Sequence, residues 1–376
     1  TATVGSATTV TSTDVNVDAG DDITLSGVDA AKVEMATVQV TTASGLTAEV
    51  GTETSVVSQA LKVDVVSDTK VSTADMALEA SGTMSVSGQE SLTVSAGTVA
   101  LDAAQDGTIR MGGDAVLAAG DGIRMASVTA LDVVTGGTAS VISNELDVSV
   151  DSAVRGSMDS LSVGVSDDAT VSVGDDLTVN AKDVRVRGEG DFDLRTSGVG
   201  TVSSNSVDMS VDAGLSVSAG GAVGITSASV DVSSSTSVAV STGSLSLDSA
   251  AATEVFSGTS LTATTTTLEA HSAEDTALTA GGRVTTTSAD ATVNVGDTLD
   301  VSAANTRVRN SGVVDVFAKE GTRLTSTDMA MSVGDEVQIL GGNEVVLTTE
   351  TLALNADTSA GISARGMAMS VNDALT

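Results

Sequence analysis

Apolar residues recur in pairs two positions apart through the middle of the chain, with small polar residues between and after them. The pairs between residues 207 and 247 are Val207/Met209, Leu215/Val217, Val223/Ile225, Val230/Val232, Val238/Val240 and Leu245/Leu247. Their first members step by 8, 8, 7, 8 and 7 residues, a repeat of about 7.6 residues. Alternation with a period of two is that of a β-strand, so each repeat predicts one short strand.

The segments between the pairs consist mainly of Ser, Gly, Asp, Ala and Asn, as in Asp212–Gly214 and Ser218–Gly221. These residues tolerate turn geometry or hydrogen-bond the turn backbone with a short side chain. We therefore expect a corner after every strand. No segment carries a helical apolar stripe, so the fold class predicted is all-β.

Longer internal sequence repeats, called echoes below, support the same spacing of about 7.6 residues. Residues 168–179 return as residues 290–301, an offset of 122 residues or about sixteen steps. Residues 329–335 (Met-Ala-Met-Ser-Val-Gly-Asp) return as 367–373 (Met-Ala-Met-Ser-Val-Asn-Asp), an offset of 38 residues or about five steps. Three independent spacings thus indicate one period, and we expect residues 1–376 to form one continuous β-helical rod without an internal domain boundary.

The composition fits a thin and fully paired stack. The chain has no Pro, Cys, Trp or Tyr, and its only aromatic residues are Phe192, Phe256 and Phe317. Pro lacks the ladder donor, so a chain whose strands have neighbours on both sides has little room for it. Large rings do not fit a core in which side chains from all faces meet on one axis.

Disorder and a compact two-domain globule are both disfavoured. Charged residues make up only 18% of the chain and the mean hydropathy is +0.25, whereas disordered chains combine low hydropathy with high charge. The apolar positions are also phased, and no composition shift marks a domain boundary.

The net charge of −34 limits the classes of partner. Nucleic acid and anionic membrane surfaces would be repelled, and no apolar run is long enough to span a bilayer. Two arginine pairs, Arg185/Arg187 and Arg307/Arg309, have strand spacing. Because Asp183, Glu189, Asp191 and Asp193 surround the first pair, we interpret such pairs as parts of cross-strand charge ladders.

We expect no enzyme activity and no catalytic, cofactor-binding or metal-binding residue. His271 is the only histidine, which excludes a multi-histidine metal site within one chain, and a solvated face or turn is the simpler interpretation. The carboxylate pairs Asp21/Asp22, Asp167/Asp168 and Asp175/Asp176 are interpreted as exposed corners and not as acid–base machinery.

Calcium is considered separately, since Asp- and Gly-rich turns can coordinate it. The chain has only fragments of a calcium-roll motif, Gly112–Asp114 and Gly334–Asp335, so we expect no specific cofactor, with calcium screening of the acidic surface or calcium binding at Asp-rich turns as the alternative. The absence of Cys does not indicate a redox compartment. The sequence contains no Asn-x-Ser/Thr site for N-linked glycosylation, whereas its many Ser and Thr residues are compatible with O-linked glycans. The chain begins at Thr1 and shows no signal segment, which we interpret as a processed or partial product.

The strand-and-turn runs resemble a known module. Residues 171–179 and 331–343 are similar to the octads of the triple-stranded β-helix in the needles of phage tail spikes and type VI secretion spikes. Residues 76–86 are similar to the extracellular β-helical region of sarcoglycans. The resemblance covers nearly the whole chain at the level of pattern, although the step is slightly shorter than an octad. It implies trimerisation and a mechanical role, and it implies no site residue.

Two chain arrangements of a three-sided β-helix are compatible with the repeat, and either could be right- or left-handed. A single chain coiling alone uses about 23 residues per turn and would extend about 80 Å, whereas three intertwined chains would extend about 240 Å. Offsets of about sixteen and five steps are not multiples of three, so the echoes fall on different faces of a single-chain solenoid. Under threefold symmetry all faces are equivalent, and we therefore favour the intertwined triple-stranded β-helix.

The function predicted is structural: a stiff extracellular filament shaft, of the cell-surface fibre or flagellar-hair (mastigoneme) type. The alternative is the shaft of a phage-type tail fibre or adhesin whose receptor-binding tip lies outside this sequence. Ice binding through residues 264–267, four consecutive threonines, is a weaker third option because Thr does not recur in register on one face. We expect self-association as a homo- or hetero-trimer, and end-to-end polymerisation because the repeat is evident from Val10 to Val371 with no cap. We therefore expect a segment of a longer fibre, anchored by a protein that the sequence does not name.

Overall fold

The structure is a computed structural model that describes residues 2–4, 8–19, 23–27, 31–42, 46–50, 53–65, 69–127, 129–333, 335–357, 359–363 and 365–375. It clusters into two compact units, Thr1–Glu189 and Gly190–Thr376, which are described one at a time. No helix occurs among the described residues, so the all-β class is confirmed.

The strands of the first unit are β1 (Ala2–Val4), β2 (Thr8–Ala19), β3 (Ile23–Gly27), β4 (Ala31–Thr42), β5 (Leu46–Val50), β6 (Glu53–Val65), β7 (Thr69–Ser72), β8 (Asp75–Ala80), β9 (Met84–Gly88), β10 (Leu92–Ala103), β11 (Asp106–Met111), β12 (Ala115–Ser127), β13 (Ala130–Thr135), β14 (Thr138–Ser143), β15 (Glu145–Val150), β16 (Ala153–Val165), β17 (Ala169–Val173) and β18 (Leu177–Gly188).

The strands of the second unit are β19 (Phe192–Thr196), β20 (Gly200–Ser203), β21 (Ser206–Val211), β22 (Leu215–Ala219), β23 (Ala222–Ser227), β24 (Ser229–Ser234), β25 (Ser237–Ser249), β26 (Thr253–Ser257), β27 (Ser260–Ser272), β28 (Thr276–Ser288), β29 (Asp290–Val295), β30 (Thr298–Asn310), β31 (Val314–Ala318), β32 (Gly321–Val333), β33 (Glu336–Gly341), β34 (Glu344–Ala356), β35 (Ser359–Ser363) and β36 (Gly366–Leu375).

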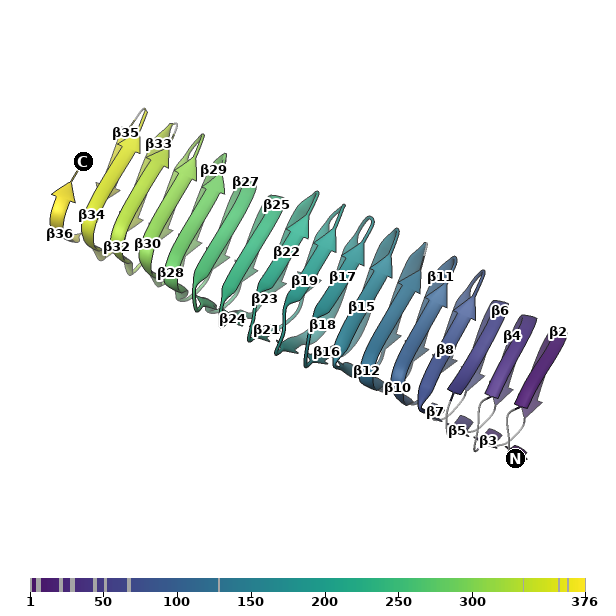
Figure 1. Cartoon of the computed structure of the whole chain (residues 1–376). Helices are drawn as coiled ribbons and strands as arrows, with labels where there is room; N and C mark the ends of the chain where they lie inside the picture. The colour runs from purple at the N-terminus through teal and green to yellow at the C-terminus, as the bar shows by residue number, and fades with distance from the viewer. Residues whose placement is uncertain are drawn as a thin grey trace. The chain divides into compact units, whose positions relative to one another are not determined.

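Within each unit the described strands pair in parallel with the segment one coil further along the same chain. Thr93 is in register with Val116, and Ala222 is in register with Ser244. One coil therefore takes about 23 residues, as three repeats of the apolar phrase require. Figure 1 shows the stacking, with β28, β30 and β32 side by side as their registers require.

The single-chain β-solenoid is therefore the arrangement that the structure shows. Each chain segment finds its ladder partner one coil away in the same chain, as expected for a chain that coils alone. The intertwined arrangement of three chains stays a prediction, since a single chain does not test it. The same holds for the continuity of one rod over residues 1–376.

Each coil of the second unit has three sides. Side A consists of β21, β24, β26 and the first halves of β28, β30, β32 and β34. Side B consists of β19, β22, the first halves of β25 and β27, and the second halves of β28, β30, β32 and β34. Side C consists of β20, β23, the second halves of β25 and β27, and β29, β31, β33 and β35.

Where a strand such as β22 or β24 forms one side of a coil, three of its residues point inward, one more than the apolar pairs predict. In β22 the predicted pair is Leu215/Val217, and Ala219 at the corner is buried as well. In β24 the three are Val230, Val232 and Ser234, all buried. The predicted phase is confirmed, and the third position was missed because it is small and often polar.

The burial of the middle inward residue varies along the second unit. Ala263 and Ala270 of β27 are only half-buried, whereas Ile339 and Leu347 are 2% exposed within a cluster of buried apolar residues. Ile339 and Leu347 thus belong to a densely packed part of the axis.

The shorter echo falls on different sides, as expected for a solitary coil. Met329 lies on side B in register with Leu352, whereas Met367 is in register with Val345 of side A. Met329 is 2% exposed and Met367 is 52% exposed. Both residues nevertheless pair with inward-facing partners, so the same sequence segment can form either side A or side B.

Candidate functional site

Buried hydroxyl groups clamp the corners of the coils. Ser257, which is 0% exposed, points its Oγ at the carbonyl oxygens of Thr236 (2.9 Å) and Ser260 (2.7 Å). Thr236 belongs to the corner of the preceding coil, and Ser260 immediately precedes the next inward residue. One hydroxyl therefore bonds across its own turn and to the preceding coil, and adds a further donor to Thr236 O, which also accepts the backbone N–H groups of Thr259 and Ser260.

The same arrangement recurs along the second unit. The corner residues that repeat both contacts are Ser234, Thr242, Ser249, Thr265, Ser272, Ser326 and Thr349. In the first unit Ser127 bonds Gln105 O (2.5 Å) and Ala130 O (2.8 Å) in this way. At one corner an amide serves instead: Asn310, which is 7% exposed, donates from Nδ2 to Ser288 Oγ at 3.0 Å.

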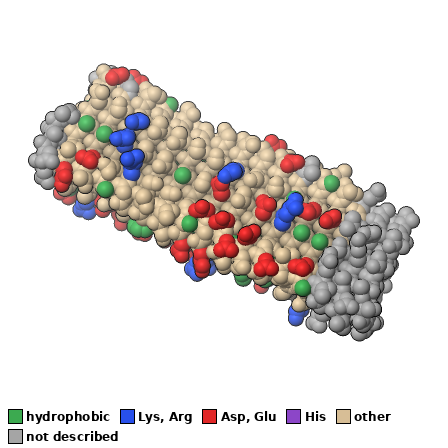
Figure 2. All heavy atoms as spheres, viewed as in Figure 1, with side chains coloured by type: hydrophobic (Ala, Val, Ile, Leu, Met, Phe, Trp, Pro, Cys, Tyr) green, Lys and Arg blue, Asp and Glu red, His purple; other side chains and the backbone are tan. Residues whose placement is uncertain are grey.

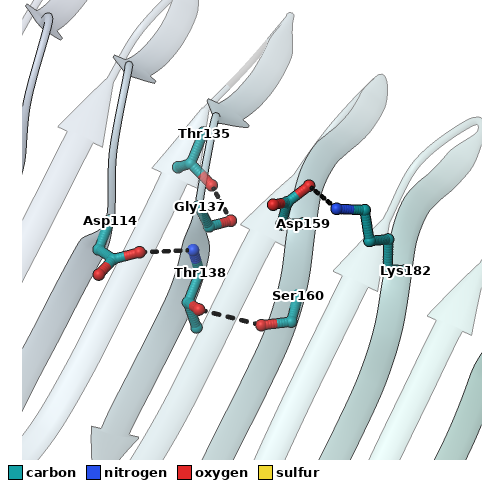
Figure 3. A network of polar contacts seen from close by, with 7 residues as sticks. All are labelled: Asp114, Thr135, Gly137, Thr138, Asp159, Ser160 and Lys182. Atoms are coloured by element: carbon teal, nitrogen blue, oxygen red, sulfur yellow. Dashed lines mark hydrogen bonds and ion pairs between the residues drawn. The ribbon is translucent and has the colours of Figure 1, made fainter.

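Corner carboxylates form a second type of clamp, on the outside. Asp114 Oδ1 accepts the backbone N–H of Thr138 at 2.7 Å, one coil further along (Figure 3). The hydroxyl groups of Thr138 and Ser160 then lie 3.0 Å apart, and Lys182 Nζ lies 3.0 Å from Asp159 Oδ1. Asp275 and Asp290 accept the N–H groups of Thr298 and Val313 in the same manner. Acidic corners thus stabilise the stacking of successive coils.

The carboxylate pairs singled out in the sequence lie at such corners. Asp167/Asp168 and Asp175/Asp176 lie in the turns that precede β17 and β18. Asp175 Oδ2 accepts from Ser152 Oγ at 3.0 Å, which joins the corner to the coil before it. The interpretation as corners is confirmed for these pairs, whereas Asp21/Asp22 lies outside the described residues.

The Val-Gly-Asp phrase of the longer echo is explained by close stacking. A Cβ on Gly174 would overlap the carbonyl oxygen of Asp151, and one on Gly296 would overlap that of Ala273. No described residue has a positive φ, so glycine is required here by the approach of the neighbouring coil and not by a left-handed conformation. Both glycines donate their N–H to the preceding corner at 2.7 Å.

The one histidine, His271, is exposed on side C. It is in register between Asp248 and Asn294, and Asn294 Nδ2 lies 3.3 Å from His271 Nδ1. Its place on a solvated strand face matches the expectation from the sequence.

No group of three or more His, Cys, Asp or Glu side chains in the described part of the chain is arranged to hold a metal ion. In the calcium-roll fragment, Asp114 bonds a backbone N–H and Gly112 stacks on Gln89. Gly334 of the second fragment lies outside the described residues. Cation screening of the acidic surface stays a prediction.

Charge ladders occur, but not at the second arginine pair. Arg155 lies 3.6 Å from Asp132, directly in register, and Arg323 lies 3.3 Å from Asp300 in the same way. Arg307 and Arg309 instead have Thr285, Thr287, Ala330 and Ser332 as their register neighbours, none of them acidic. Among the described residues neither arginine forms an ion pair, so the ladder interpretation is wrong for this pair.

Threonine does recur in register on one side, which corrects the sequence-based expectation. Thr262 is paired with Thr285, and Thr264 with Thr287, all pointing outward on side B. The same two outward positions hold Ser216, Ser218, Ala239 and Ser241 in the preceding coils, so they are uncharged over four successive coils. Alternation along the chain does not reveal which threonines are in register, because the register depends on the number of residues in a coil.

Side A carries the opposite feature, a column of carboxylates. Asp208, Asp231 and Glu254 are in register on three successive coils. Burial, followed by the negative charges of Asp208 and Glu254, raises the pKa of Asp231 above its usual value. Figure 2 shows red carboxylate side chains spread across the surface in view, with fewer blue cationic ones.

Two groups of residues were missed by sequence reasoning: the corner hydroxyls and the side-specific columns. The spacing of Ser and Thr four positions after each first apolar residue could have indicated the former. The columns require the coil length. No family model, no curated protein and no solved structure matches the chain. Within the described residues, no helix is long and apolar enough to cross a membrane.

Proposed function

We propose that the protein is the shaft of a stiff extracellular filament, of the cell-surface fibre or flagellar-hair (mastigoneme) type, with stiffness as its activity and no catalytic role. The observation that carries the proposal is the pairing of each strand with the segment one coil away, through corners clamped by buried hydroxyls. Both the ladder and the corner bonds run from coil to coil, which is the direction in which a shaft bears load.

Stiffness would arise from many small and equal contributions. Each coil adds a set of parallel ladder bonds and buries inward side chains, at roughly 0.8 kcal/mol per buried methylene before conformational entropy is subtracted. Because coils contact only their neighbours, the stability of such a stack is approximately a sum over coils. Bending would have to lengthen hydrogen bonds at many coils at once.

Self-association belongs to the same proposal. Copies are proposed to join end to end, and a trimer of such shafts is the proposed higher assembly. The likeness to spike needles and sarcoglycan β-helices supports a shaft in which the binding function, if present, resides elsewhere. An adhesin or tail-fibre shaft would have the same strand ladders and corner hydrogen bonds and would differ by a receptor-binding partner at its tip.

Imaging of purified chain tests this proposal. We expect straight particles by electron microscopy, a bending persistence length well above the particle length by atomic force microscopy, and antibody labelling on the outside of intact cells. Circular dichroism should show β-structure. Globular particles, or flexible chains of the same mass, would contradict a shaft, and purely internal labelling would contradict an extracellular one.

A further inference from the structure

The second unit carries two surface features of opposite charge that its own folding leaves unmatched. On side B, Arg307 and Arg309 point outward from β30, both exposed, with hydroxyl and methyl groups as register neighbours. The same two positions are uncharged in the four preceding coils, from Ser216 to Thr287, and Arg283 at the start of side B adds an exposed cation one coil earlier. In a chain of net charge −34, this is a basic patch with uncharged outward residues at the same positions on the coils before and after it.

Side A presents a surface suited to arginine. Asp231 and Glu254 are exposed, in register on adjacent coils, and neither forms an ion pair among the described residues. Phe256 lies two residues after Glu254 on the same strand face and is 48% exposed. Carboxylates beside an open aromatic ring bind a guanidinium through charge-assisted hydrogen bonds and cation–π attraction together.

Another carboxylate on side A, Asp300, does have a cation beside it. Asp300 lies on the same side three coils after Asp231 and is matched in register by Arg323 at 3.3 Å. Asp231 has carboxylates and not a cation on both adjacent coils. The unmatched charge of Asp231 and Glu254 is therefore available to a partner.

We propose that a second copy of this chain is that partner, with Arg307 and Arg309 of one copy docking on Asp231, Glu254 and Phe256 of the other. The contact joins side B to side A and is therefore heterologous. Such a contact does not close on two copies but continues from copy to copy, or closes as a ring. This inference rests on the proposed shaft function and adds lateral bundling to it.

The geometry also sets a stagger between neighbouring copies. Asp300 lies three coils after Asp231 in the same register column, with Glu254 and Ala277 between them. Asp300 is on the same strand, β30, as Arg307. Copies packed in parallel would therefore be offset by about 14 Å, or three strand spacings.

Salt dependence distinguishes this contact from others. At low ionic strength, copies of net charge −34 repel over long distances, whereas at about 0.15 M salt the Debye length of about 8 Å leaves mainly short-range contacts. At 1 M salt the ion pairs themselves are screened. We expect association, measured by analytical ultracentrifugation, to be strongest near 0.15 M and at least about tenfold weaker at 1 M. Association that rises steadily up to 1 M salt would overturn the proposal, since apolar contacts behave in that way.

A charge-swap experiment assigns the residues. The double variants Arg307→Glu/Arg309→Glu and Asp231→Lys/Glu254→Lys should each lose association, because each carries like charges on sides A and B. An equimolar mixture should regain it, since the side A of one variant would then find the oppositely charged side B of the other. The regained association also shows that both variants are folded. Loss without recovery in the mixture would overturn the proposed pairing, as would association of either variant alone at the level of the unchanged chain.

The matched control is Lys319→Glu/Arg365→Glu, which changes the net charge by the same amount as the arginine variant, at exposed positions elsewhere in the second unit. It should associate like the unchanged chain. Straight but unassociated particles in electron microscopy would contradict lateral docking alone, whereas the absence of straight particles would contradict the shaft itself.

Discussion

At the scale of single residues, a buried hydroxyl is stabilising or destabilising according to whether an acceptor lies within reach. Ser257 has two carbonyl acceptors and is fully buried. Thr322, 2% exposed, occupies the first inward position of its strand, and its Oγ1 has no hydrogen-bond partner. At Ser257 the corner brings carbonyl oxygens from two coils within reach of the hydroxyl, whereas Thr322 Oγ1 reaches no acceptor.

Ser257→Ala should lower the free energy of unfolding by about 1 kcal/mol, because two corner carbonyls would lose their hydroxyl donor. The cost is modest since Ala280 and Ala303 occupy the same corner in later coils. Urea denaturation followed by circular dichroism measures it.

Thr322→Val is the matched control, since it removes a buried hydroxyl that has no partner while keeping the shape of the side chain. It should raise the stability by about 1 kcal/mol. If both variants shifted stability in the same direction, the distinction between corner and strand positions would be wrong.

At the scale of the element, alternation correctly predicted which apolar side chains of a strand point inward, but it missed the inward residue at the corner. Val230 and Val232 were expected inward and are buried. Ser234 is also buried, although its polar side chain interrupts the apolar pattern. Periodicity of hydropathy detects only apolar inward residues, so the corner position is invisible to it.

Val232→Asp should destabilise the second unit by at least about 3 kcal/mol, because an ionised carboxylate would enter the axis without a partner. Ser218→Asp, on the outward face of side B and in register with Arg195, should change stability by less than about 0.5 kcal/mol. Chemical denaturation of the two variants side by side checks the phase, and equal effects would contradict it.

At the scale of the whole molecule, the carboxylates act in two opposite ways. At Asp64, burial raises the pKa, but the hydrogen bonds from Lys62 and Ser87 and the charge of Lys62 outweigh it, so the pKa is lowered. Asp64 thus stabilises the fold above pH 3.8, and this contribution is lost as the pH falls through its lowered pKa. Asp231 has a raised pKa, so its ionised form costs stability at neutral pH.

Acidification from pH 7 should therefore first stabilise the second unit, as Asp231 takes up a proton above pH 3.8, and destabilise the first unit below that pH. Asp231→Asn should raise the melting temperature at pH 7 and remove the initial rise on acidification. Asp315→Asn is the control, since Thr292 and Gln338 are its uncharged register neighbours, and it should leave the melting temperature nearly unchanged. Thermal melts between pH 3 and pH 7 measure all three proteins.

The amino-acid sequence by itself determined the strand period, the phase of the inward apolar pairs and the turns between strands, because these depend on side-chain alternation and turn chemistry within a few residues. The tertiary structure decided which segments of the chain pair, since the short step alone does not fix how many residues make one coil. It also decided which outward residues form columns. Thr262 meets Thr285 and Asp231 meets Glu254 only because the coil closes after three strands there, a length set by the packing of three sides around one axis.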